Sequence, residues 1–518
     1  MKLRIYKIFL ISVVILIHSI NVSAAPINDL IKKWKQHGFL VFTIPVKLDA
    51  LEPTSSLSAH TKLSLPLIYE PLVAIASKQE LQPVLAASWL ISTDNKSVTI
   101  VIKQKHFFSD NTEVTAQDVV NSINRVCSQN SKVFEEMKGL TGCEDHAKGK
   151  NVDAEMKVIG KYEIKFNINC SPTNFLFQLS SPSLVITKQT NHGLVGSGPY
   201  IVEEKNENYM VLNKNPYASS DNIAKNTGVA ILYTNQNDIF SILKNDKPDG
   251  SIMYRMQDIW NFKDENYRLV KVNPNITEIL VLNNQHFPFN KPIVRKALSS
   301  SIYNNFMQTC IPGAHKPYGV IPYGTGGSIA SSPPKKFPEI SAKEVFKEVP
   351  ELKNKKTIVF IHQLDDLKNN CESEQITKAA KQFNIDIQFK YHKTYSTLEP
   401  LYLNHKLDGF IELYVFKNRE AYSMLQFFTQ AGENNANVNN NVIDEMLYKA
   451  IAEPSSHRRF QAYRKIAEYI QSEAILVPLF YMDHGNLLST CLAETSDNFL
   501  FNPFSYIPQL NKIKGCNI

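Results

Sequence analysis

Cysteine and histidine are the residue types in this 518-residue chain whose chemistry depends most on spacing. Seven cysteines permit up to three disulfides in an exported protein and leave at least one thiol over. Two pairs are close in sequence: Cys127 with Cys143, and Cys491 with Cys516. Each disulfide would close a short loop and stabilise the fold by ~3 kcal/mol. No CxxC is present, and the thirteen histidines include no HxxxH pair, so the spacing favours neither a zinc knuckle nor a close metal pair.

Motifs for catalysis are equally scarce. The chain has no Gly-x-Ser-x-Gly elbow, no His-Glu-x-x-His and no Gly-Lys-Ser/Thr tripeptide of a phosphate loop. The expectation is therefore a protein that is not an enzyme and needs no cofactor. A hydrolase whose triad is assembled from distant residues remains the alternative from another class.

The first residues predict an exported protein. Three basic side chains precede an apolar run at 8–17, and Val22-Ser-Ala24 stands before Ala25-Pro26. This is the pattern of a secretory signal peptide at 1–24, cleaved near Ala24. The apolar run is shorter than the ~20 residues that span a bilayer, and the first cysteine, Cys127, is too distant to carry an N-terminal lipid. We therefore expect a periplasmic protein without a membrane anchor.

Charge excludes one class of partner. Without its first 24 residues the chain carries 53 basic and 49 acidic side chains, a formal charge of +4. This balance is too mild to predict binding to nucleic acid. A chain of this length that is 43% hydrophobic can bury a large core, and its length predicts about three domain-sized units. We expect a monomer.

Local patterns predict individual elements. Apolar residues alternate along 97–103, which predicts a strand with one buried face. Thr115 and Asp118 have the spacing of a capping box, which predicts that a helix starts near Thr115. Near the C-terminus, five residues recur at helical spacing and predict a core stripe: Phe460, Tyr463, Ile466, Ala467 and Ile470.

These elements belong to a series of segments that resembles one family. Gly196-Ser-Gly-Pro-Tyr200 is similar to the family's G-T-G-P-Y turn, and in the segment 107–120 Asn111 replaces a usual glycine, which its tolerance of a left-handed turn allows. The segment 281–298 resembles a strand leading into a helix, with Arg295 held by packing and pairing at a domain edge. Further matching segments are 68–73, 85–89, 441–447 and 459–481. Together they resemble the family 5 solute-binding proteins of ABC importers, which capture peptides, nickel chelates or related solutes outside the inner membrane.

The resemblance implies an α/β fold. It would be a two-lobed periplasmic binding protein, type II-like with an extra subdomain, and the ligand cleft would lie between the lobes. Lobe I would take residues 25–68, 188–272 and 482–518, the subdomain 69–187, and lobe II 273–481.

The segment that would contact the ligand departs from the family's pattern. Peptide-binding members carry an acidic residue there that pairs with the peptide's terminal ammonium, and this position reads Phe416. Glu412, slightly earlier, is then the candidate carboxylate, Arg419 could face an anionic group such as the ligand's own carboxylate, and Tyr414 completes the predicted ligand-binding residues. The alternative is that Glu412 is an ordinary strand residue.

The implied function is that of the substrate-binding component of an ABC transporter. It would capture peptides or peptide-like solutes by hinge closure and deliver them to an inner-membrane permease. Two alternatives stay open. One is a nickel or metal-chelate protein of the same family, although His392 and His405 lie in the appropriate third of the chain without a metal motif. The other is an exported scaffold or sensor with a degenerate cleft, which the change at Phe416 favours.

Overall fold

The computed structural model describes most of the chain. The described residues are 27–55, 57–75, 81–235, 238–255, 259, 261–305, 310–311, 313–329, 336–354, 356–364, 368–415, 421–430, 432–453, 455–493 and 502–516. The signal peptide predicted at 1–24 lies outside them. Within the described residues, no helix is both long enough and apolar enough to span a membrane.

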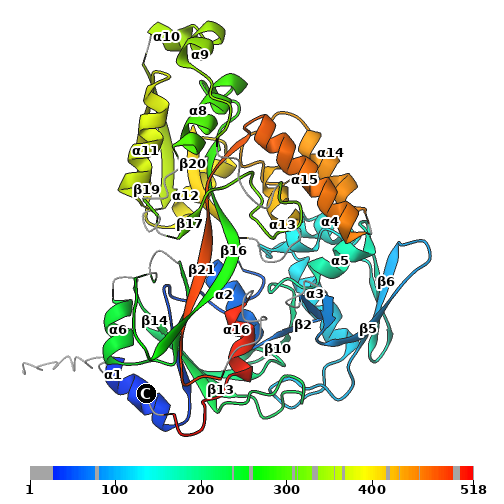
Figure 1. Ribbon diagram of the computed structural model, residues 1–518. Coiled ribbons are helices and arrows are strands. Elements are labelled where there is room, and N and C mark those ends of the chain that lie inside the picture. Colours follow the sequence, from blue (N-terminus) through cyan, green and yellow to red (C-terminus); the bar gives the residue numbers. More distant parts are fainter. Residues whose placement is uncertain are drawn as a thin grey trace, which may run out of the picture.

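A mixed sheet shared by two lobes organises the fold (Figure 1). Its strand order is β12-β13-β14-β1-β15-β21-β16-β20-β18-β19, with the short β17 added to β21. Neighbouring strands β14, β1 and β15 are parallel in one lobe, and β20, β18 and β19 are parallel in the other. The predicted two-lobed α/β fold is confirmed.

Two long strands carry the chain between the lobes. β16 (Tyr267–Leu282) and β21 (Leu476–Ser489) pair antiparallel along most of their length. The pairing register shifts between Val272 and Ile276, about midway along β16, so the ladder is interrupted where the strands pass from one lobe to the other.

The lobe at the bottom of Figure 1 contains the first and last described segments of the chain. One of its cores is built from residues of three separate stretches, 40–69, 185–270 and 488–510. Its elements are α1 (Ile27–Gln36), β1 (Leu40–Ile44), α2 (Ala59–Ser64), η1 (Leu65–Leu67), β10 (Lys188–Thr190), β11 (Gly193–Val195), β12 (Tyr200–Lys205), β13 (Tyr209–Lys214), β14 (Gly228–Tyr233), α6 (Ile239–Asn245), β15 (Gly250–Arg255), α16 (Pro503–Tyr506) and η6 (Ile507–Gln509).

A further unit lies beside this lobe and has its own core, drawn entirely from residues 72–186. Its four-stranded sheet has the order β5-β6-β8-β7. The elements are β2 (Glu70–Pro71), β3 (Val73–Ile75), β4 (Leu81–Pro83), β5 (Ala86–Ile91), β6 (Ser97–Ile102), α3 (Ala116–Val126), η2 (Phe134–Met137), α4 (Cys143–Ala147), β7 (Met156–Gly160), β8 (Glu163–Asn167), α5 (Pro172–Gln178) and β9 (Val185–Ile186).

The upper lobe of Figure 1 has two cores, both drawn from residues 276–482. Its elements are α8 (Pro292–Asn304), β17 (Ala314–His315), α9 (Ala342–Glu348), α10 (Glu351–Asn354), β18 (Thr357–Leu364), α11 (Asn370–Lys381), β19 (Ile385–His392), α12 (Tyr395–Leu403), β20 (Gly409–Val415), α13 (Tyr422–Leu425), η4 (Gln426–Phe428), α14 (Val442–Ile451) and α15 (Ser456–Ser472).

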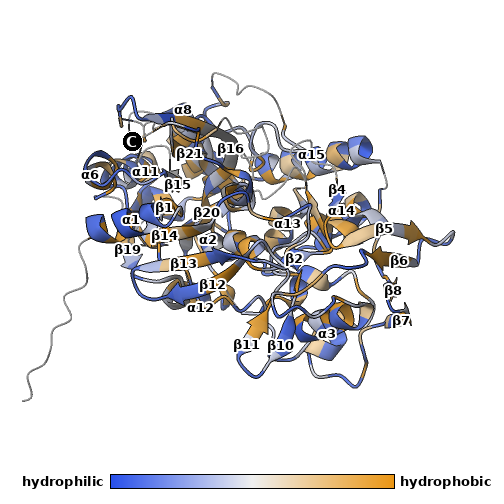
Figure 2. Cartoon of the chain, turned by 90° about the horizontal axis from the view of Figure 1, so that it is seen from below, coloured by the Kyte–Doolittle hydropathy of each residue, from blue (hydrophilic) through white to orange (hydrophobic). Residues whose placement is uncertain are grey.

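The predicted local elements are confirmed. β6 buries its alternating apolar residues, and α3 begins directly after Thr115. The Thr115 backbone N–H and Oγ1 both donate to the Asp118 carboxylate, at 2.8 and 2.6 Å. Asn111 has a φ of 63°, the left-handed conformation that asparagine tolerates. In α15 the predicted stripe packs in the core, with Phe460 only partly buried. Figure 2 shows that hydrophilic and hydrophobic residues both occur along this helix.

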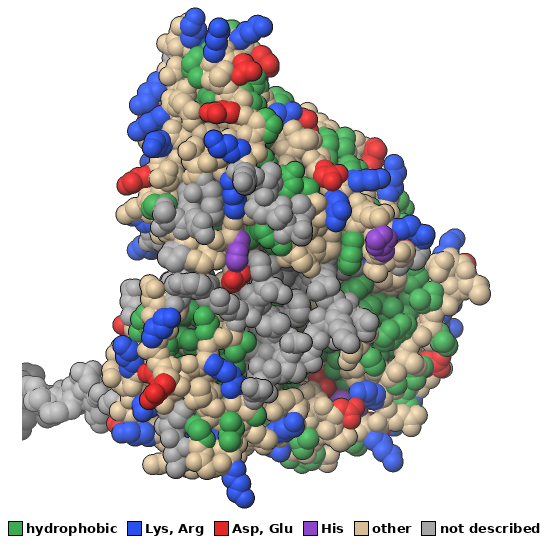
Figure 3. All heavy atoms as spheres, in the orientation of Figure 1, with side chains coloured by type: hydrophobic (Ala, Val, Ile, Leu, Met, Phe, Trp, Pro, Cys, Tyr) green, Lys and Arg blue, Asp and Glu red, His purple; other side chains and the backbone are tan. Residues whose placement is uncertain are grey.

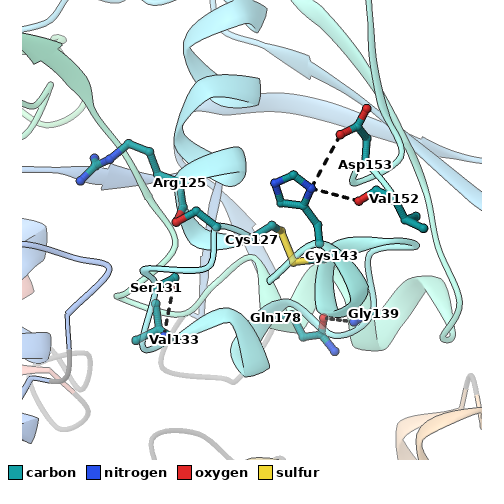
Figure 4. The surroundings of a disulfide bond; sticks show 11 residues. Arg125, Cys127, Ser131, Val133, Gly139, Cys143, Val152, Asp153 and Gln178 are labelled. Carbon is teal, nitrogen blue, oxygen red and sulfur yellow. Dashed lines mark hydrogen bonds and ion pairs between the residues drawn. A yellow bond between two sulfur atoms is a disulfide. The ribbon is translucent and has the colours of Figure 1, made fainter. Parts of the chain in front are cut away.

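Both predicted disulfides are present. Cys127, at the end of α3, is bonded to Cys143 at the start of α4 (Figure 4), and Cys491 is bonded to Cys516. A third bond, between Cys310 and Cys371, joins residues 61 positions apart and was not predicted. Cys170 is the remaining thiol.

The glycines of the 196–200 turn serve a close backbone approach. A Cβ on Gly196 would lie 2.2 Å from the Ile68 carbonyl oxygen, and one on Gly198 would lie 2.4 Å from the Ile68 carbonyl carbon. Neither glycine has a positive φ. Glycine is therefore required because the turn crosses the chain at Ile68, before it enters β12.

Arg295 on α8 is buried, with 5% of its surface exposed. Its guanidinium donates to three backbone carbonyls, those of Phe289 at 2.7 Å, Glu473 at 3.0 Å and Ala474 at 3.1 Å. Two of these carbonyls, those of Glu473 and Ala474, lie in the turn between α15 and β21. Arg295 therefore anchors this turn shortly before β21 begins at Leu476.

We expect the substitution Arg295→Met to lower the free energy of unfolding by about 3 kcal/mol, because it leaves three buried carbonyls without a donor. Urea unfolding followed by circular dichroism measures this change. Lys296→Met is the matched control, since Lys296 is partly exposed and makes only a surface ion pair with Glu473. Equal midpoints for the two variants would contradict the structural role given to Arg295.

Candidate cleft between the lobes

A cleft of about 1680 Å³ lies between the lobes and the 72–186 unit. All three parts of the fold contribute to its walls, with α2 and the 219–222 segment from the lower lobe, η2 and α5 from the third unit, and α12, β20 and α13 from the upper lobe. The walls combine aromatic rings with polar side chains, as ligand sites do. The aromatic residues are Tyr69, Phe134, Phe177, Tyr402, Tyr414, Tyr422 and Phe427.

Two of the three predicted ligand-binding residues line this cleft. Glu412 and Tyr414 lie on β20, and alternation along the strand places them on the same face. Strand β16 holds them there, because Ile279 pairs with Glu412 and Thr277 pairs with Tyr414. The third, Arg419, and the position of the missing acid, Phe416, lie outside the described residues.

Tyr414 is a structural part of the wall as well as a lining residue. It is 6% exposed, and its ring packs against Phe427 and Phe428 with centroids 5.9 and 5.2 Å away. Its hydroxyl accepts a hydrogen bond from Asn435 Nδ2 at 3.1 Å. These contacts connect β20 to the segment that leads into α14.

Glu433 lies in this same segment and is not among the ligand-binding residues predicted from the sequence. Burial raises its pKa to about 7, and the nearby carboxylates of Glu135 and Glu399 add to the shift. Hydrogen bonding to Asn435 and the charge of Lys62 act in the opposite direction. Burial likewise raises the pKa of Glu399, on α12.

The opposite wall holds several of its charges in ion pairs or hydrogen bonds. Lys62 on α2 is 3.1 Å from Glu136 on η2, and Lys103 is 2.9 Å from Asp221. Glu70 accepts from Asn222 at 2.7 Å and lies 2.6 Å from His106 Nε2, and both partners of this last pair are buried. The charged groups on this side therefore tie the lower lobe to the 72–186 unit.

The described residues contain no group of three or more His, Cys, Asp or Glu side chains placed to hold a metal. His392, noted in the sequence, contacts another histidine instead, with its Nε2 2.7 Å from His362 Nδ1. Burial and the neighbouring His392 lower the pKa of His362 to about 4. His405 follows α12 and does not line the cleft described above.

Two lobes on a shared sheet, with a large cleft between them, are the architecture of a clamp-like binding protein. Residues 80–436 match the family described as bacterial extracellular solute-binding proteins, family 5. The chain belongs to this family, and the predicted resemblance is confirmed. The family and the relatives below are binding proteins, which agrees with the expectation that this chain is not an enzyme.

The relatives give the family match further detail. The chain is 22% identical over 444 residues, 81% of its own length and 82% of the relative's, to the probable D,D-dipeptide-binding periplasmic protein of Escherichia coli K12. Among solved structures it resembles the E. coli murein tripeptide binding protein, with TM-score 0.78, 18% identity and coverage of 92% and 99% of the two chains. It also resembles Haemophilus influenzae OppA in complex with the peptide RPPGFSPFR, with TM-score 0.76 and 17% identity. NikA from Brucella suis in complex with Fe(III)-EDTA has the same TM-score and identity. In both comparisons 92% of this chain and 99% of the other chain are covered. These likenesses show the fold.

Glu433 predicts a pH-dependent stability of the ligand-free protein. Its folded pKa of about 7 exceeds the ordinary 4.5, so stability falls as the pH rises from about 4.5 to 7. Glu433→Gln should remove this penalty and stabilise the protein by about 2 kcal/mol at pH 8, with no change near pH 4.5. Urea unfolding at the two pH values measures the difference, and Glu374→Gln on the exposed side of α11 is the control. An equal effect at both pH values would contradict the assignment.

Proposed function

We propose that this protein is the substrate-binding component of an ABC importer, and that it captures peptides or peptide-like solutes in the cleft between its lobes. The observation that carries the proposal is the size and composition of the cleft. At about 1680 Å³ it exceeds the ~300–1,000 Å³ of most small-molecule sites, and its aromatic and polar walls suit an extended polar ligand.

Binding would act by closing the lobes around the ligand. β16 and β21 would serve as the hinge, because their ladder is interrupted near Val272 and Ile276. Contacts between the 72–186 unit and the upper lobe support a closed form. Ser171 Oγ donates to the Ile451 carbonyl at 2.5 Å, and the Arg459 guanidinium lies 5.9 Å from the Phe177 ring centroid. A ligand that binds the closed form more tightly would shift the population toward it, and an inner-membrane permease would recognise that form.

Within the cleft, Glu412 would bind the terminal ammonium of the peptide, and Tyr414 would shape the wall beside it. Arg419 would bind the ligand's carboxylate, since a guanidinium is suited to bidentate pairing. The places of Glu412 and Tyr414 on one face of β20 support these roles.

The borders of the two lobes and of the subdomain are also part of this proposal. Lobe I would comprise 25–68, 188–272 and 482–518, the subdomain 69–187, and lobe II 273–481; the separate hydrophobic cores support these borders. The protein would act in the periplasm as a monomer after removal of residues 1–24.

Native mass spectrometry of the mature protein from periplasm, followed by identification of any released mass under denaturing conditions, tests the proposal. We expect short peptides to be released. A released metal chelate would instead support the nickel-type alternative. A reproducibly empty protein that no peptide mixture stabilises thermally would support the scaffold alternative.

Arg419→Met tests the proposed carboxylate partner. Loss of a charge-assisted pair in a desolvated cleft should weaken binding of a free tripeptide at least 10-fold, as measured by titration calorimetry. The C-terminally amidated tripeptide should lose much less, because it lacks the carboxylate. Arg458→Met is the matched control, since Arg458 is exposed on α15 and pairs with Glu453. Unchanged affinity of Arg419→Met for the free tripeptide would rule out this role.

A further inference from the structure

The described walls of the cleft carry an excess of negative charge. Eight carboxylates line it against three lysines, and no arginine or histidine is among the lining residues. Two of the lysines, Lys62 and Lys103, are already paired with carboxylates of the same walls. Lysine and arginine gather instead on the outer edge of the upper lobe (Figure 3). The carboxylates are Asp49, Glu70, Glu135, Glu136, Asp221, Glu399, Glu412 and Glu433.

Most of these carboxylates are engaged by the protein itself. Asp49 accepts from the Ser58 backbone and from Thr61, Glu70 from Asn222, and Glu135 lies 3.3 Å from the ammonium of Lys138. Glu399 and Glu433 differ. Neither is joined in an ion pair to any cation in the described part of the chain, although both are partly buried on the cleft wall.

A polar group hydrogen-bonded to Glu433, on the same cleft wall as Glu399, indicates what these carboxylates would bind. Asn435 lines the cleft, is 6% exposed, and has an Oδ1 atom without a hydrogen-bond partner among the described residues. Its Nδ2 is occupied by the Tyr414 hydroxyl. A buried acceptor without a donor is uncommon in folded proteins and is satisfied most directly by an N–H group of a ligand.

We propose that Glu399, Glu433 and Asn435 form a subsite for a second positive group of the ligand, separate from the terminal ammonium, so that the cleft selects peptides with a lysine or arginine side chain. An ammonium or guanidinium supplies both the charge that two carboxylates lack and the donor that Asn435 Oδ1 lacks. This inference rests on the proposed peptide-binding function and names its ligand class.

Proton binding would compete with the ligand at this subsite. The charged groups that face Glu433 are Glu135 on η2, Glu399 on α12 and Lys62 on α2. With a pKa of about 7, Glu433 is mostly protonated at pH 5.5 and ionised at pH 8. Affinity for a basic peptide should therefore fall as the pH is lowered through 7, while affinity for a neutral peptide should change less.

Titration calorimetry with three tripeptides, Ala-Lys-Ala, Ala-Ala-Ala and Ala-Glu-Ala, tests the subsite on the mature, disulfide-bonded protein freed of co-purified ligand. At pH 8 we expect Ala-Lys-Ala to bind at least 10-fold more tightly than Ala-Ala-Ala, and Ala-Glu-Ala to bind most weakly. At pH 5.5 the preference for lysine should fall by about 10-fold.

Two variants assign the preference to the subsite. Glu433→Gln and Glu399→Gln should each reduce the Ala-Lys-Ala to Ala-Ala-Ala affinity ratio by about 10-fold, and Glu433→Gln should also remove its dependence on pH. Glu374→Gln, on α11 outside the cleft, is the matched control and should keep both the ratio and the pH dependence.

The outcomes separate this inference from the proposed function. Equal affinity for all three tripeptides would overturn the subsite and leave peptide binding standing. No binding of any tripeptide, together with Glu433-dependent binding of spermidine, would overturn peptide capture and support a cation subsite. Failure of every peptide and of spermidine to bind would overturn both.

Discussion

The backbone ladder between β16 and β21 is the interaction on which the rest of this structure depends. It joins the parallel strands of one lobe to those of the other in a single sheet, and it carries the chain across the boundary in both directions. Side chains reinforce the same strands. The Tyr481 hydroxyl lies within hydrogen-bonding distance of the carbonyl oxygens of Gly319 and Ile321, at 2.8 and 3.0 Å, and shares its one hydrogen between them. Arg295 anchors the turn before β21. The pairing register shifts between Val272 and Ile276 and again between Glu278 and Ile279. Bending can concentrate at the first of these shifts, where the strands pass between the lobes, while both lobes keep their own cores.

The same strands also position acidic side chains on the cleft wall. Strand β20 is fixed against β16, so Glu412 is held at the wall whether or not a ligand is bound. Glu433 is hydrogen-bonded to Asn435, whose Nδ2 also donates to the Tyr414 hydroxyl, and burial raises the pKa of Glu433 although the hydrogen bond to Asn435 lowers it. A buried carboxylate without a cation costs folding free energy. In a binding protein such a carboxylate can favour binding, because a cationic ligand supplies the charge interaction that is absent from the ligand-free protein.

The parts of this molecule that are local in sequence could be predicted from it, and the parts that depend on distant segments could not. The capping box of Thr115, the left-handed Asn111 and the disulfide between Cys127 and Cys143 are each decided within some twenty residues. The bond from Cys310 to Cys371 forms because α11 packs against α8, which no spacing rule indicates. Of the three predicted ligand-binding residues, Glu412 and Tyr414 line the cleft, since alternation along β20 places both on one face, and Arg419 lies outside the described residues. Their roles toward a ligand stay predictions.

Glu433 shows why the ligand is harder to predict than the fold. In sequence it is one acid next to an asparagine-rich connection, and only the meeting of α12, β20 and η2 around it makes it unusual. Solved relatives of nearly equal likeness hold a peptide in one case and an iron chelate in another, so the shared architecture cannot choose between ligand classes. That choice lies in the few side chains that line the cleft without an ion pair. Glu399 and Glu433 are two such carboxylates in the described part of this chain, and a positive group on the proposed ligand would supply the charge that they lack.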